Sequence, residues 1–268
     1  MRWLLALAGI VALALSLSSV GRRGGDDALF VYVGAGFRLP VEEVASRFRE
    51  ETGVSVELSF AGSGCLLAQA ALSRRGDLYM PGEEFFMAQA REQGLITREA
   101  DIAYMRPVIL VPRGNPKNIE GVADLGRPGL RVGLGDPLAT ACGISAEEVL
   151  RGLPSQARVR ANVIMNALNV NELGTAVALK ALDAAIAWDA TADLFRLDTE
   201  ALAIPPKIGK PTTIPLGILS FTRRPEEARR FLEFMGDEQG GVAVFKEHGY
   251  ETPGLPKAAP SPSGSAVL

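Results

Sequence analysis

The feature that most constrains the fold is a repeated order of a short apolar run, a turn of small residues and an amphipathic helix. Residues 28–33 form a continuous apolar run that ends at Gly34, as a buried strand does. After Pro40, apolar side chains recur at helical spacing up to Gly53, which predicts a helix. Residues 54–60 then alternate between apolar and polar, which predicts a strand. A strand, a helix and a second strand in this order predict a parallel α/β sheet.

The same order continues along the chain and predicts two α/β series. The further helices are expected at residues 66–72, 83–93, 143–150, 172–182, 225–235 and 238–248, and the further strands at residues 77–80, 105–112, 130–134, 158–164, 184–187 and 214–221. Because strands and helices alternate, each series is expected to form a doubly wound, mostly parallel sheet.

A polar stretch rich in glycine and proline, residues 113–129, separates the two series. One late strand and two helices follow the second series, so the chain is expected to return to its first lobe. Two crossings are predicted, near residues 108–113 and near residues 205–216. The predicted domains are residues 28–110 with 214–250 for lobe 1, residues 111–213 for lobe 2, and residues 251–268 for a disordered tail rich in Pro, Ser, Gly and Ala.

Residues 1–23 predict a secretory signal peptide. Arg2 supplies a positive start, residues 3–17 are almost wholly apolar, and small serines follow them. The apolar run is short for a membrane span, although an uncleaved N-terminal anchor is an alternative. A lipoprotein anchor is not supported, because no cysteine follows the apolar run. The mature protein is therefore expected in the periplasm or outside the cell.

Composition argues against several classes of function. Of the 268 residues, 47% are hydrophobic and 22% are charged, which suits a folded core. The net charge of −3 disfavours nucleic acid as a partner, because phosphate binding needs a basic surface. Two cysteines and one histidine exclude a four-cysteine zinc site and leave little room for a Ser-His-Asp enzyme. Ala61 also replaces the first glycine that a G-x-S-x-G nucleophile elbow around Ser63 would need. The sequence therefore predicts a binding protein without a cofactor, and an enzyme on the same fold remains as an alternative.

Three turns share a design that suits an anion. Residues 34–37, 62–65 and 140–143 each place small residues between the end of a strand and the start of a helix. The unpaired N–H groups at a helix start point outward and carry the positive end of the helix dipole. Ser63 adds a hydroxyl donor. Three such turns on facing lobes predict a site that wraps a tetrahedral oxyanion without lysine or arginine.

Four motifs carry a family resemblance. They are VGAGF at residues 33–37, SFAGSG at residues 59–64, the Gly135-Asp136-Pro137 turn with Cys142-Gly143, and FKEHGY at residues 245–250. Over residues 28–250 the chain resembles the periplasmic molybdate-binding proteins of ABC importers. The resemblance implies a two-lobed periplasmic binding protein that closes on its ligand by hinge motion. It also implies binding of molybdate or tungstate, delivery to an ABC permease in the inner membrane, and action as a monomer.

The resemblance further implies a set of ligand contacts. Carried over to this chain, they are Gly36, Ser63, Gly64, Ala141, Cys142, Asn171, Glu172, Trp188 and Asp189. Gly36 replaces a serine that commonly offers a hydroxyl group in the family, and Trp188 replaces a tyrosine. Thr140 and Ala141 stand where the tungstate-binding branch has a carboxylate. These departures leave the choice of oxyanion open.

The two cysteines leave an alternative ligand open. Cys65 and Cys142 each lie near the start of a predicted helix, one in each lobe, and a helix N-terminus lowers a thiol pKa. Packing of two small side chains is one interpretation, and a disulfide that would lock the lobes together is another. In a third, both sulfurs bind a soft metal or a thiophilic ligand, with Met80 and with Glu172 or Asp189 as further ligands.

Overall fold

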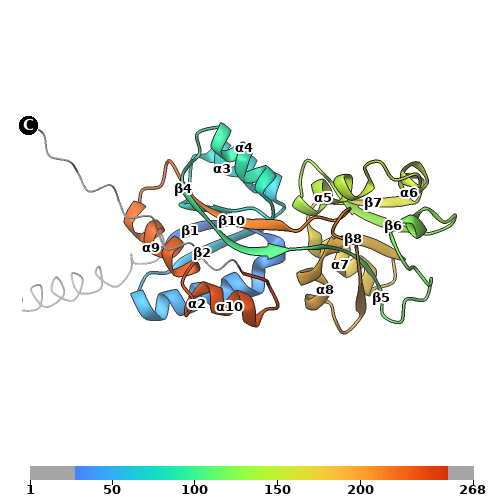
Figure 1. The fold of residues 1–268 in the computed structure, drawn as a ribbon. Coiled ribbons are helices and arrows are strands. Elements are labelled where there is room, and N and C mark those ends of the chain that lie inside the picture. The colour runs from blue at the N-terminus through green and yellow to red at the C-terminus, as the bar shows by residue number, and fades with distance from the viewer. Residues whose placement is uncertain (1–27, 253–268) are drawn as a thin grey trace, which may run out of the picture.

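Two five-stranded sheets, each flanked by helices, organise residues 28–252, which are the residues that the computed structural model describes. The sheets lie in two lobes side by side, joined by two crossings of the chain (Figure 1). Residues 1–23, predicted as a signal peptide, and residues 253–268 of the predicted tail lie outside the described range. Within that range, none of the helices has the length and apolar character that a membrane span requires.

Lobe 1 contains both ends of the described chain. Its elements are β1 (Leu29–Gly34), η1 (Ala35–Phe37), α2 (Arg38–Thr52), β2 (Val56–Ala61), α3 (Ser63–Ser73), β3 (Leu78–Met80), α4 (Glu84–Glu92), β4 (Ile96–Met105), β10 (Thr212–Leu219), α9 (Pro225–Met235) and α10 (Gly241–Glu247). The strand order is β2-β1-β3-β10-β4. β1 runs parallel to β2 and β3, whereas β10 runs antiparallel to β3 and β4.

Lobe 2 also consists of a five-stranded sheet with flanking helices, and the middle of the chain forms it. Its elements are β5 (Pro107–Pro112), η2 (Val122–Gly126), β6 (Val132–Gly135), α5 (Ala141–Leu150), α6 (Gln156–Ala161), β7 (Val163–Ala167), α7 (Val170–Ala178), β8 (Ala184–Trp188), α8 (Asp189–Leu194) and β9 (Thr199–Ala203). The strand order is β7-β6-β8-β5-β9. β6 runs parallel to β7 and β8, and β5 runs antiparallel to β8 and β9.

The two-lobed α/β architecture is therefore confirmed, with mixed sheets in place of mostly parallel ones. The first crossing lies at Arg106, between β4 and β5, and the second spans residues 204–211. Residues 107–110, expected in lobe 1, belong to the sheet of lobe 2 because β5 pairs there with β8 and β9. Every residue of β5 is buried, which explains its unbroken apolar sequence.

Several segments differ from the sequence-based prediction. Helix α8 was not predicted, and α2 begins at Arg38, two residues before Pro40. Residues 158–164, predicted as one strand, contain the end of α6 and the start of β7. Arg158 and Arg160 flank buried Val159 and imitate the alternation of a strand. β4 and β9 have no full counterpart in the prediction. Both lie at the edge of their sheet, and in β4 exposed polar residues interrupt the apolar pattern.

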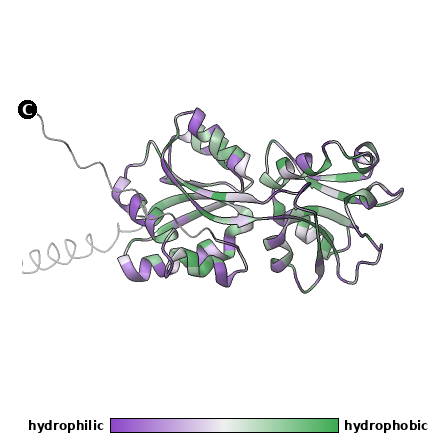
Figure 2. Ribbon diagram, in the orientation of Figure 1, coloured by the Kyte–Doolittle hydropathy of each residue, from purple (hydrophilic) through white to green (hydrophobic). Residues whose placement is uncertain are grey.

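Apolar side chains gather between the sheets and their helices. Figure 2 shows hydrophobic residues along the strands of both lobes and hydrophilic residues on outward parts of helices such as α2 and α9. Helix α2 ends at Gly53, which adopts the left-handed conformation with φ of 73° that favours glycine. Its buried face includes Val41, Val44 and Phe48, as the helical spacing predicts.

Replacing Phe48 with alanine tests the helix layer of lobe 1. Phe48 is buried and packs edge-on against Phe231 and Phe234, with ring centroids 5.1 and 5.4 Å apart. We expect Phe48→Ala to lower the free energy of unfolding by about 3–5 kcal/mol, because it leaves a cavity. Chemical denaturation measures the change. Phe85→Ala is the control, since Phe85 is 43% exposed, and equal losses in the two variants would contradict the assigned packing.

Candidate functional site

The cleft between the lobes lies where the parallel strands of both sheets end. Ligands of open α/β sheets bind at this edge. The lining residues are Gly34, Ala35, Gly36, Phe37, Ala61, Gly62, Ser63 and Gly82 of lobe 1, and Thr140, Ala141, Cys142, Asn169, Val170 and Trp188 of lobe 2. They enclose a cavity of about 30 Å³. Sites for drug-sized organic ligands measure roughly 300–1,000 Å³, so this cleft suits a ligand of only a few heavy atoms.

The cleft offers hydrogen-bond donors without any charged side chain in its lining. Ser63, Ala141 and Val170 are the first residues of α3, α5 and α7. Their N–H groups have no partner within the helix, and each helix directs the positive end of its dipole toward the cleft. Donors therefore converge from both lobes on one small volume, an arrangement that stabilises an anion.

Ser63 is held in place by two hydrogen bonds. The N–H of Gly82 donates to Ser63 Oγ at 3.0 Å, and the hydroxyl of Tyr79 donates to the Ser63 carbonyl at 2.9 Å. Because Ser63 Oγ accepts from Gly82, its own hydrogen remains available to donate to a ligand. The residue is 3% exposed, so such a bond forms away from bulk water.

The turn after β1 is fixed from the C-terminal side of the described chain. The hydroxyl of Tyr250 donates to the Gly36 carbonyl at 3.1 Å, and its ring packs edge-on against Phe37. Burial raises the pKa of Tyr250, so its hydroxyl stays protonated and keeps this bond. Tyr250 of the FKEHGY motif therefore holds the turn after β1 in place.

The lobes touch directly across the cleft, so the structure is a closed form. The Gly64 N–H donates to the Ala139 carbonyl at 2.9 Å. Asn171 Nδ2 donates to the Ala35 carbonyl at 3.0 Å. A Cβ added at Gly62 would lie 2.3 Å from the Leu168 carbonyl oxygen, so only glycine allows this approach.

The structure divides the predicted ligand residues into three groups. Gly36, Ser63, Ala141, Cys142 and Trp188 line the cleft. Gly64 and Asn171 bridge the lobes beside the cleft and do not line it. Glu172 and Asp189 also lie outside the lining.

Glu172 stabilises the start of α7. Its carboxylate accepts from the Leu168 N–H at 2.9 Å and from Asn169 Nδ2 at 2.6 Å. In return, the Glu172 N–H donates to Asn169 Oδ1 at 3.2 Å. This reciprocal pattern is a capping arrangement, so the carboxylate is engaged at the start of the helix.

Asp189 holds the first crossing between the lobes. Its Oδ1 accepts from the N–H of Arg106 at 3.2 Å and from that of Ala190 at 2.9 Å. The Arg106 guanidinium forms a bidentate pair with Glu251 at 2.6 and 2.5 Å. Glu251, predicted as the first residue of a disordered tail, is thus bound to this crossing, and its backbone also bridges to Tyr104. That part of the prediction is wrong, because a contact with a distant arginine leaves no local signal.

Sequence reasoning also missed cleft residues. Gly82 follows β3 after Pro81 and precedes α4, an order of strand, small residue and helix like that of the three selected turns. That order is a signal that could have identified it. Asn169 and Val170 line the cleft in place of Asn171 and Glu172, two residues further along. Asn169 caps α7, and its residue type is the usual sign of a helix start.

Comparison with known proteins decides the family. The family of bacterial extracellular solute-binding proteins matches residues 29–251 of this chain. The chain belongs to this family. Solute-binding proteins act outside the cytoplasm by binding and releasing a ligand, which agrees with the predicted lack of enzymatic activity.

Individual relatives resemble this solute-binding protein over most of its length. The molybdate-binding protein ModA of Mycobacterium tuberculosis is 24% identical over 94% of this chain and 100% of its own. The structure of the Azotobacter vinelandii periplasmic molybdate-binding protein is 20% identical with a TM-score of 0.73, covering 84% of this chain and 99% of that one. The sulfate-binding protein SubI of M. tuberculosis is 19% identical with a TM-score of 0.76, covering 85% and 87%. These structures share the two-lobed fold.

The two cysteines differ in their surroundings. Both are free; Cys65 is exposed and Cys142 is buried. Burial raises the pKa of Cys142 to about 11, although a helix start was expected to lower it. Its sulfur lies 3.5 Å from Thr140 Oγ1, and Met80 is buried in β3. Within residues 28–252, no group of three or more His, Cys, Asp or Glu side chains is arranged to hold a metal ion.

Glu83, next to the cleft residue Gly82, carries a buried carboxyl group that the sequence analysis did not select. Glu83 is 8% exposed, and its Oε2 has no hydrogen-bond partner among the described residues. Burial, and then the negative charge of Glu148 on α5, raise its pKa to about 8. The group is therefore mostly neutral near pH 7 and does not repel an anion in the cleft.

Replacing Glu83 with glutamine is expected to weaken the pH dependence of stability. At pH values between the ordinary pKa of a glutamate and about 8, Glu83 is ionised in the unfolded chain and protonated in the folded one. The folded state then binds more protons, so stability falls as pH rises, by about 1.4 kcal/mol per pH unit from this group. Glu83→Gln removes this contribution, which denaturation at several pH values measures. Exposed Glu120→Gln is the control, and an unchanged slope in Glu83→Gln would contradict the prediction.

Proposed function

We propose that this solute-binding protein captures a tetrahedral oxyanion, molybdate or tungstate, and delivers it to the permease of an ABC importer. The observation that carries the proposal is the cleft, which is small, free of charged side chains and lined by the starts of α3, α5 and α7. In this proposal the protein acts as a monomer outside the inner membrane, after removal of residues 1–23 as a signal peptide.

The proposed mechanism is capture between two sets of oriented dipoles. The ligand binds first to one lobe, and hinge motion then brings the second set of N–H groups onto its free oxygens. Backbone donors at Gly36, Ser63, Ala141, Cys142 and Val170 supply most of the contacts. Because the donors are fixed by the helices, they replace the hydration shell of the anion with little reorganisation.

Neutral donors also favour a ligand that stays fully ionised. Hydrogen bonds to a charged group contribute more than those to a neutral one, and the desolvated cleft strengthens them further. Molybdate, tungstate and sulfate offer the same four acceptor oxygens, so cavity size and hydration must separate them. The molybdate-binding relatives support molybdate first, while SubI makes sulfate the competitor to test.

The soft-metal alternative through Cys65 and Cys142 has less support. Cys65 is exposed and outside the cleft lining, and the Cys142 thiol is buried with a raised pKa. A neutral thiol is a poor metal ligand, because the thiolate is the form that binds. We therefore propose no metal site at these residues.

A thermal-shift panel tests the proposed function. Molybdate and tungstate are expected to raise the melting temperature of the mature chain at low concentration, because a ligand that binds only the folded state stabilises it. Sulfate, phosphate and Cu(I) under reducing conditions are expected to have smaller effects. Ser63→Ala is expected to weaken oxyanion affinity by about 10-fold or more, because the variant loses one hydrogen bond to a charged group.

The matched control is Ser155→Ala, which alters a buried serine outside the cleft. Isothermal titration of both variants gives the affinities. A panel without any oxyanion shift would refute the proposal. Equal affinities for the Ser63 and Ser155 variants would remove the Ser63 hydroxyl from the site.

Gly62→Ala is expected to block closure while leaving the fold intact. The added Cβ would lie 2.3 Å from the Leu168 carbonyl oxygen and 2.5 Å from that of Ala139, both in lobe 2. The backbone of Gly62 is extended, with φ of −67°, so alanine is tolerated in the open form. We expect molybdate affinity to fall by more than about 10-fold, with unchanged or slightly higher stability without ligand.

Scattering and titration together measure this effect. Gly121→Ala is the control, because Gly121 is also extended and nothing lies within 4 Å of its added Cβ. Small-angle scattering is expected to show that molybdate compacts the control and leaves the Gly62 variant open. Normal compaction of Gly62→Ala would show that the closed form does not require this approach.

A further inference from the structure

A second cavity lies at the opposite edge of the lobe 1 sheet from the inter-lobe cleft. It is lined by residues at the amino ends of the parallel strands, namely Ala28 and Phe30 at β1, Glu57 at β2, and Gly76 and Asp77 before β3. The end of α3 and the segment after β10 complete it. Its volume is about 610 Å³, within the roughly 300–1,000 Å³ of small-molecule sites.

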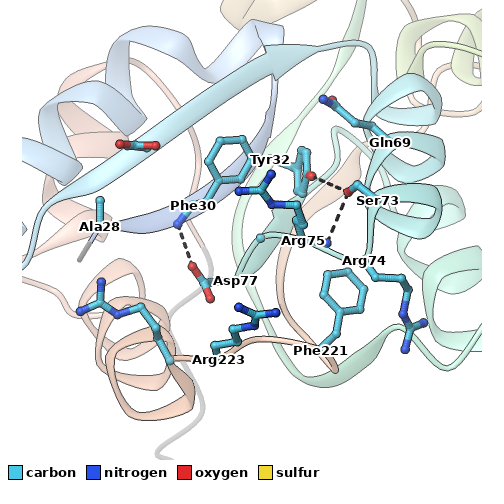
Figure 3. A pocket seen from close by; sticks show the side chains of 13 residues that line it. Ala28, Phe30, Tyr32, Gln69, Ser73, Arg74, Arg75, Asp77, Phe221 and Arg223 are labelled. Atoms are coloured by element: carbon cyan, nitrogen blue, oxygen red, sulfur yellow. Dashed lines mark hydrogen bonds between the residues drawn. The ribbon is translucent and has the colours of Figure 1, made fainter. Parts of the chain in front are cut away.

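Arginines and aromatic rings dominate this cavity, which we call the arginine pocket. Its arginines are Arg74, Arg75, Arg223 and Arg224, and its aromatic residues are Phe30, Tyr32 and Phe221. Figure 3 shows Phe30, Tyr32, Arg75 and Phe221 around the same space, although they come from separate segments. The Arg74 guanidinium stacks over the Phe221 ring, 4.8 Å from its centroid.

Two acidic residues, Glu57 and Asp77, stand beside four arginines in the lining of the pocket. Asp77 uses both carboxylate oxygens, accepting from the Phe30 N–H at 2.8 Å and from Thr222 Oγ1 at 2.5 Å. Glu57 forms no ion pair among residues 28–252, and neither Arg75 nor Arg223 does so in that part of the chain. The pocket therefore keeps an excess of positive charge.

Arg224 also has an unsatisfied donor. Its Nη2 lies 3.4 Å from Glu227 Oε1, whereas its Nη1 is buried and has no partner among the described residues. Arg224 lines the pocket, so an anion bound there would be stabilised by its positive charge. Arginine forks match carboxylate and phosphate oxygens, and aromatic rings bind the flat face of an organic group.

We propose that the arginine pocket is a second ligand site, which binds a small organic anion with a planar ring. The cleft binds a ligand of a few heavy atoms with neutral donors, whereas this pocket combines charge with aromatic surface at the other end of the strands. The two sites are separate, so both can be occupied at once. The proposal does not depend on which oxyanion fills the cleft.

Phenyl phosphate is the probe for this site, because it joins a planar ring to a phosphate group. We expect it to bind the full mature chain with one-to-one stoichiometry in isothermal titration. Inorganic phosphate and phenol, which each carry half of the probe, are expected to bind at least 10-fold more weakly. Saturating molybdate and the Gly62→Ala substitution in the cleft are expected to leave phenyl phosphate affinity unchanged.

Arginine substitutions locate the binding. The double variant Arg75→Gln with Arg223→Gln is expected to weaken phenyl phosphate at least 10-fold, and both side chains are exposed, so the fold should persist. Arg151→Gln, an exposed arginine in lobe 2, is the control and is expected to have no effect. Phe221→Ala is expected to weaken phenyl phosphate more than it weakens inorganic phosphate.

Three results would overturn the proposal. The first is the absence of phenyl phosphate binding at millimolar concentration. The second is binding that the arginine variants leave unchanged and Gly62→Ala or molybdate abolishes, which would place the probe in the cleft. The third is binding only after Asp26→Asn with Asp27→Asn, because the acidic residues preceding Ala28 would then be the natural occupant.

Discussion

The parallel pairing of β1 with β2 and β3, and of β6 with β7 and β8, decides where the cleft between the lobes lies. Parallel strands end at one edge of a sheet, and the helix that follows each strand begins at the same edge. The two sheets turn these edges toward each other across the cleft. Three helix starts, at Ser63, Ala141 and Val170, consequently meet around one cavity. The same topology leaves the amino ends of the strands in lobe 1 for the arginine pocket.

The electrostatic character of the cleft follows from partial charges alone. An ionised side chain in so small a space would carry a large desolvation penalty, whereas backbone N–H groups are already oriented by their helices. The nearby acidic groups are kept from opposing an anion in different ways. Glu172 is engaged at the start of α7, and burial keeps Glu83 protonated near neutral pH. An acidic protein can therefore present an electropositive cleft.

Closure depends on small residues and on the crossings. Gly62 and Gly64 face backbone carbonyls of the opposite lobe so closely that a Cβ at either position would overlap them. Asn171 adds a hydrogen bond between the lobes. At the first crossing, Asp189 binds the Arg106 backbone while the Arg106 side chain binds Glu251. Several residues that were predicted as ligand contacts thus form contacts between the lobes or at the first crossing.

The sequence by itself determined the two α/β series, the small-residue turns, the start of α9 at Pro225 and the end of α2 before Gly53, because periodicity, proline and glycine act on their near neighbours. The turns at residues 34–37, 62–65 and 140–143 could be selected for the same local reason, and all three contribute to the cleft. Only the tertiary structure decided which residues line the cleft. Asp189 meets Arg106 at the first crossing, and burial in lobe 2 raises the pKa of Cys142. Both outcomes depend on residues far apart in the chain, whose proximity no local pattern records.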